Sequence, residues 1–167
     1  MEDQTVENKL TTIKTTMAAF CTALGAFLGW QGIMAVAWVL AMLLDYLTGS
    51  LAACKRGEWC SAAAREGLWH KAGMIVAVCV AAISDGVLEV ICANIPIGFQ
   101  WPVLVLPLVL AWYIITELGS ILENAVKMGA PVPEWLIRFL KASLELVDGA
   151  GEDAAERKQT DTTKVLQ

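Results

Sequence analysis

The stretch CKRGEWCSAAAREGLW, residues 54–69, decides the fold because it places positive charge between two long apolar segments. Three basic residues lie in it, and Lys71 follows two residues after its end. No Lys or Arg occurs in residues 18–53 or 72–126, and the remaining basic residues lie at the N-terminus and in the C-terminal third. Positive charge stays on the cytoplasmic side of inserted helices. The pattern therefore predicts a multi-pass membrane protein with this loop and both termini in the cytoplasm.

The composition agrees with a membrane protein. Hydrophobic residues make up 57% of the 167 residues and charged residues 17%, and the mean hydropathy is +0.58. Soluble domains are about 45–50% apolar and about 25% charged. A chain of this length leaves no room for a separate soluble domain beside its membrane part. The net charge is −5, and the acidic residues in excess are scattered along the chain. The sequence indicates no surface for binding nucleic acid.

The apolar segments predict an all-α fold with four transmembrane helices in residues 1–127. About 20 residues suffice to cross a bilayer, so the apolar run from Ile13 to Ala53 is too long for one span. A turn at Gly29–Gly32 divides it. The alternative is a single tilted helix near 17–44, which gives three spans in all. It would place Lys9 and Lys14 on the opposite side of the membrane from Lys55 and Arg56. The expected spans lie near 13–29, 33–53, 70–93 and 102–127.

The C-terminal part is predicted to lie outside the hydrocarbon. Pro131 and Pro133 end the last span, so residues 128–147 are expected to form a Pro-bounded, amphipathic cytoplasmic helix. Its apolar positions recur at helical spacing, and its charge excludes a span, so we expect it to lie along the inner leaflet. Residues 148–167 are rich in Gly, Ala, Thr and charge and are expected to be a disordered tail.

Small residues recur every four positions in two of the expected spans and so share one side of each helix. Such ridges allow close helix packing in lipid, and the first span adds a GxxxG. The alternative is that Ala and Gly are simply common in spans. The candidate residues for helix packing and self-association are Gly25, Gly29, Ala37, Ala41, Gly49, Ala53, Gly73, Ala77 and Ala81.

Acidic residues at membrane depth are the second candidate feature. They are Asp45, Asp85, Glu89 and Glu117. A charge at the centre of a lone span costs about 2.5–3.5 kcal/mol, so such residues face a bundle interior or water. With no Lys or Arg expected at their depth, they are protonated, paired with polar groups, or facing an aqueous path. They either join helices as neutral acids or become wet when helices assemble into a pore.

Catalytic and metal chemistry are not indicated. The five cysteines include no CxxC, and the one His has no Cys at ligand spacing, so we expect no metal and no cofactor. No nucleophile, base and orienting group can be assembled, and no phosphate-binding loop is present. We expect a protein without enzymatic activity.

Several motifs resemble those of the phage-lysis and toxin-secretion holin family, which includes the clostridial toxin-secretion holin. Residues 45–55, DYLTGSLAACK, are similar to its D-x-x-x-G-x-x-x-A-x-K core. His70-Lys71 stands where the family has Arg-Lys before a later Asp, here Asp85. The run from Glu117 through Asn124 to Gly129–Pro133 is similar to the ending E-x-x-S-I-x-x-N … G-x-P-V-P. The resemblance covers about residues 40–147.

The resemblance implies a holin, which oligomerises in the bacterial cytoplasmic membrane and opens it. The partners implied are the bilayer, further copies of the chain, and a cytosolic endolysin or toxin that is released, with lysis of the host. Two other classes stay open: a small regulated transporter or channel subunit, which intramembrane acids would suit, and a membrane scaffold that recruits a soluble partner through its tail.

Overall fold

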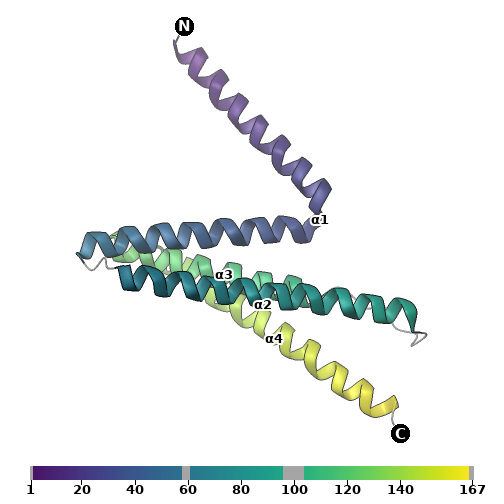
Figure 1. The fold of residues 1–167 in the computed structure, drawn as a ribbon. Helices are drawn as coiled ribbons and strands as arrows, with labels where there is room; N and C mark the ends of the chain where they lie inside the picture. The colour runs from purple at the N-terminus through teal and green to yellow at the C-terminus, as the bar shows by residue number, and fades with distance from the viewer. Residues whose placement is uncertain (1, 58–60, 96–103, 166–167) are drawn as a thin grey trace. The chain divides into compact units, whose positions relative to one another are not determined.

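The computed structural model describes residues 2–57, 61–95 and 104–165, which are helical throughout apart from short connections (Figure 1). The all-α prediction is confirmed. The helices are α1 (Glu2–Arg56), α2 (Ser61–Asn94), α3 (Val105–Lys127) and α4 (Glu134–Val165). The chain divides into two compact units, Met1–Val36 and Ala37–Gln167.

Helix α1 is interrupted where the sequence predicts a turn. Gly29 has φ 67° and ψ −176°, a positive φ that a residue without Cβ adopts readily. The structure therefore breaks the helix at one glycine and resumes it at once, instead of forming a four-residue turn. Gly29 therefore allows the backbone to leave the helical conformation, and it does not continue a helical packing face from Gly25. The side-chain surroundings of Gly25 lie outside the described residues.

Three segments among the described residues are long and apolar enough to cross a membrane: Gly29–Arg56, Gly67–Asn94 and Val105–Lys127. They match the last three of the four expected spans, and they agree with the alternative in number but not in its first span near 17–44. The segment before Gly29 is helical but is not one of them. A fourth span near residues 13–29 therefore remains a prediction.

The expected cytoplasmic loop is shorter than residues 54–69. Helix α1 continues to Arg56, and α2 already begins at Ser61, because the Ala-rich run after it favours helix. Two turns of α2 thus precede His70, where the span was expected to start. The expected outer turn, residues 94–101, lies mostly outside the described residues, as does the expected start of the last span at Pro102.

Helix α3 begins at Val105, so Pro107 lies in its first turn. The N–H groups of a first turn have no acceptor within the helix. A proline there therefore removes no hydrogen bond from the helix. Pro107 is buried and introduces no kink.

The other end of α3 closes in a Schellman motif. The N–H of Ala130 donates to the carbonyl of Ala125 at 3.0 Å, and that of Gly129 to Val126 at 2.8 Å. Gly129 has φ +89°, the left-handed conformation that this motif requires. The turn, followed by Pro131 and Pro133, ends α3 where the sequence predicts.

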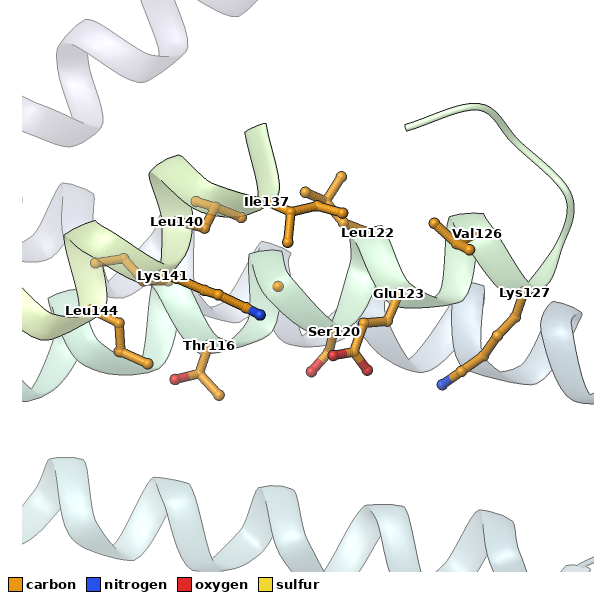
Figure 2. Close-up of a pocket in the computed structure, with 12 residues that line it drawn as sticks. Thr116, Ser120, Leu122, Glu123, Val126, Lys127, Ile137, Leu140, Lys141 and Leu144 are labelled. Carbon is orange, nitrogen blue, oxygen red and sulfur yellow. The ribbon is translucent and has the colours of Figure 1, made fainter. Parts of the chain in front are cut away.

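Helix α4 packs against α3 through the apolar side chains of its first three turns. Ile137, Leu140 and Leu144 line one wall of a groove whose other wall is α3 (Figure 2). The structure differs from the expected disordered tail, since it continues α4 to Val165. Residues 152–158 are mostly Ala, Glu, Lys and Arg, which rank among the better helix formers.

Replacing Gly129 by Ala should destabilise the second unit by about 1–2 kcal/mol, since Cβ is unfavourable at positive φ. The added Cβ would also lie 3.3 Å from Lys55 Nζ. Unfolding of the purified protein by SDS in mixed micelles measures the change. Gly149→Ala is the control, because Gly149 lies inside α4 with open space around it, and this variant should be as stable as the parent or more so. Equal stability of G129A and the parent would contradict the assignment.

Candidate functional site

One basic side chain joins two acidic side chains between the three apolar helices. Lys71 of α2 donates from Nζ to Glu117 Oε2 of α3 at 2.6 Å and to Oε1 at 2.7 Å. The same nitrogen donates to Asp45 Oδ2 of α1 at 3.0 Å. The exposed fractions of these side chains are 13% for Lys71, 20% for Asp45 and 4% for Glu117. Each helix thus contributes one charge to a cluster that is largely withdrawn from its surroundings.

An amide extends this cluster toward the end of α3. Asn124 Nδ2 donates to Asp45 Oδ1 at 3.0 Å and approaches Thr48 Oγ1 at 3.4 Å. Asn124 also lies against Gly49, where an added Cβ would be 3.4 Å from its Nδ2. Lys71 and Asn124 therefore bind different oxygens of the Asp45 carboxylate. We call Asp45, Lys71, Glu117 and Asn124 the polar cluster.

Asp85 of α2 has a different role, because its carboxylate accepts hydrogen bonds from backbone N–H groups at the start of α3. Its Oδ1 accepts from Leu104 N at 3.3 Å and Val105 N at 3.1 Å, and its Oδ2 accepts from Leu106 N at 2.7 Å. Pro107 has no N–H, and Leu108 N donates to Leu104 O at 3.2 Å. Every backbone donor of this first turn is thereby satisfied, and the carboxylate lies at the positive end of the helix dipole.

Lys55, at the end of α1, reaches the opposite end of α3. Its Nζ donates to the carbonyl oxygen of Met128, the residue that follows the last turn of α3. A cation there stabilises the negative end of the helix dipole. The contact also places the ends of α1 and α3 at the same end of the bundle, as the charge pattern predicts.

The structure uses the two ridges of small residues only in part within one chain. Ala41 and Ala81 are buried, and Gly49 contacts Asn124. Ala53 and Ala77 are half-buried, whereas Ala37 and Gly73 are exposed. Contact between copies through these ridges remains a prediction.

The intramembrane acids separate into two kinds. Asp45, Asp85 and Glu117 each have partners within the chain, whereas Glu89 is exposed on α2. The expectation that no Lys or Arg shares their depth is wrong, because Lys71 pairs with two of them. Among the described residues, no group of three or more His, Cys, Asp or Glu side chains is placed to hold a metal ion.

Sequence reasoning missed Lys71 because the loop was expected to extend to residue 69. A usable signal was present, since Asp45 and Lys71 lie thirteen residues on either side of position 58 in the connection. Two antiparallel helices joined there bring equidistant residues to the same depth. The polar cluster can hold helices together; its geometry offers no nucleophile and base in contact.

Replacing Lys71 by Met should destabilise the protein by about 3 kcal/mol, because it leaves two carboxylates buried without their cation. The triple variant K71M/D45N/E117Q should regain most of this loss, since it removes the charges together. SDS unfolding in mixed micelles again measures stability. The control is Lys127→Met at the exposed end of α3. A K71M protein as stable as K127M would show that the ion pairs contribute little.

Replacing Asp85 by Ala should loosen the start of α3 and destabilise the protein by about 1 kcal/mol, as for loss of a helix cap. Glu89→Ala is a matched control one turn further along α2, because Glu89 is exposed. Amide hydrogen exchange of residues 104–106 reports on the capped groups. Faster exchange in D85A alone is expected; equal exchange in the two variants would refute the capping role.

Comparison with known proteins shows the family of this chain. A sequence profile of the bacteriophage holin family matches residues 22–144. An uncharacterized 14.9 kDa protein of Clostridium perfringens is 31% identical over 136 residues, covering 81% of this chain and 96% of that protein. An uncharacterized protein of Halalkalibacterium halodurans is 31% identical over 137 residues, covering 82% of this chain and 94% of its own. No solved structure matches significantly.

The matched region contains all three candidate spans and the whole polar cluster, and it ends within α4. The matches extend over most of the chain and nearly the whole length of these relatives. The chain is therefore a membrane protein that belongs to the bacteriophage holin family.

Proposed function

We propose that this chain is a holin that oligomerises in the bacterial cytoplasmic membrane and opens lesions through it. The lesions release a cytosolic cell-wall hydrolase or toxin, and the host lyses. The observation that carries the proposal is the family match over residues 22–144. We assign the chain no catalytic activity, and before the copies assemble we place its loop after α1 and its C-terminus in the cytoplasm.

The polar cluster supports a monomer that can accumulate in the membrane without harm. Its charges are paired inside the chain, so they place no unpaired charge against lipid. The outward side chains of α2 are apolar, among them Val76, Val80 and Ile83, which are 62%, 58% and 65% exposed. Such a surface suits lipid, and it leaves Ala37 and Gly73 open for contact with further copies.

Expression in a bacterial host with and without a cytosolic muralytic enzyme tests the function. The expected result is a sudden loss of membrane potential after a delay, with falling turbidity only when the enzyme is present. The physical reason is that a lesion dissipates ion gradients by itself, whereas lysis requires access of the enzyme to the cell wall. Membrane potential is followed with a voltage-sensitive dye and lysis by turbidity.

Steady growth with an intact potential would contradict the proposal and favour a gated transporter or channel subunit. A chain ending at Val147 separates the holin from a scaffold. In a holin, removal of residues 148–167 should shift the time of lysis. In a scaffold that recruits a partner through this segment, the removal should abolish the effect, and the intact chain should not permeabilise membranes.

A further inference from the structure

Helix α4 presents three different faces along its length. Ile137, Leu140 and Leu144 face α3 across the groove, and Lys141 lines the edge of the same groove (Figure 2). On one flank, exposed charged residues recur at steps of four and three, a spacing that keeps them on one side of a helix. We call them the charged stripe: Glu134, Arg138, Lys141, Glu145, Asp148 and Glu152. On the other flank lies an apolar stripe of Trp135, Phe139 and Leu146, which are 64%, 62% and 75% exposed.

The docked α4 reaches far along α3. The groove has a volume of about 530 Å³, and its α3 wall runs from Ile115 to Lys127. These twelve steps correspond to about 18 Å of helix, more than half of a hydrocarbon core about 30 Å thick. Since α3 is a candidate span that ends at Lys127, the docked part of α4 lies alongside its membrane-embedded half.

At that depth the charged stripe cannot face lipid. Arg138, Lys141 and Glu145 all belong to the docked part of α4, and each would cost about 2.5–3.5 kcal/mol at the centre of a bilayer. Among the described residues, α4 is not one of the segments apolar enough to cross a membrane. The docked arrangement therefore requires water on the charged flank, while the apolar flank suits lipid.

We propose that the charged stripe of α4 lines the aqueous lumen enclosed by several copies of this chain, with α4 docked on α3 and its apolar stripe facing lipid. The inference rests on the proposed function and names the surface that faces water. In a lone chain the docked helix would have lipid on every free side, so we assign the docked arrangement to the assembled copies and not to the monomer that accumulates beforehand. Several copies arranged around a centre bring their charged stripes to a shared aqueous space.

The same geometry argues against the buried acids as the lumen surface. The carboxylates of Asp45, Asp85 and Glu117 are bound to groups within their own chain. Exposing them to a lumen would break contacts that join three helices. The charged stripe requires no such rearrangement, because its side chains are already exposed.

Two neighbouring positions provide a matched test. Glu145 and Leu146 are both exposed, at the same depth, and about 100° apart around the helix. In a full-length chain whose five cysteines are replaced by Ala, E145C and L146C each receive an environment-sensitive fluorophore. The labelled proteins are reconstituted in vesicles of phosphatidylglycerol and phosphatidylethanolamine that contain a trapped dye. Iodide quenches fluorophores in contact with water, and phospholipids brominated near the headgroup or near the chain end report depth in lipid.

In vesicles that leak dye, we expect severalfold stronger iodide quenching at position 145 than at 146. Position 146 should be quenched more by bromine near the chain end than by bromine near the headgroup. Leaking vesicles in which headgroup bromine quenches position 146 better would place α4 on the membrane surface and overturn the inference, while the proposed function stands. Equal iodide quenching at both positions would also overturn it. Failure of the cysteine-free chain and both variants to release dye, with intact chain inserted, would refute the proposed function itself.

Discussion

The contact on which the rest of the fold depends is that of Lys71 with Asp45 and Glu117. Inside a bilayer a charged side chain cannot be hydrated, so burying each of these three groups is costly unless it is paired with an opposite charge. Because the charges come from α1, α2 and α3, withdrawing α2 leaves two carboxylates without their cation, whereas withdrawing α1 or α3 leaves a single ion pair between the remaining two helices. In lipid, where apolar side chains gain little by facing each other, such polar contacts specify which helices meet and at what depth.

Helix α3 is the element that most of these contacts hold. Asp85 binds its first turn, Lys71 and Asp45 bind side chains in its middle and later turns, and Lys55 binds its last carbonyl groups. The partners come from α1 and α2 alone. Helix α4 is attached by other means, a Schellman turn and apolar side chains in a groove. The polar contacts therefore define a three-helix unit, to which α4 is added through contacts of a different kind.

The sequence predicted the helical class, three of the spans and the end of α3, because apolar run length, glycine and proline act locally. It did not predict how the acids are satisfied, since this depends on the register between antiparallel helices. The boundary of α2 was the decisive error, because two extra turns before His70 bring Lys71 to the depth of Asp45 and Glu117. Asp85 was identified as important, but its role depended on α3 starting at Val105 instead of Pro102, and no motif in the sequence indicates that shift.

The order of the three charges along the chain has a consequence for biogenesis. The hairpin of α1 and α2 contains one ammonium and one carboxylate in contact, so this ion pair is complete before α3 has been synthesised. Helix α3 then brings Glu117, an acid with no basic residue of its own until Lys127. Nascent α3 is thus poorly suited to enter lipid alone. The hairpin already in the membrane supplies Lys71, the cation that pairs with Glu117. The last span is therefore integrated with the help of the first two, and a chain released by the ribosome before α3 still holds the pair of Asp45 and Lys71 in its hairpin.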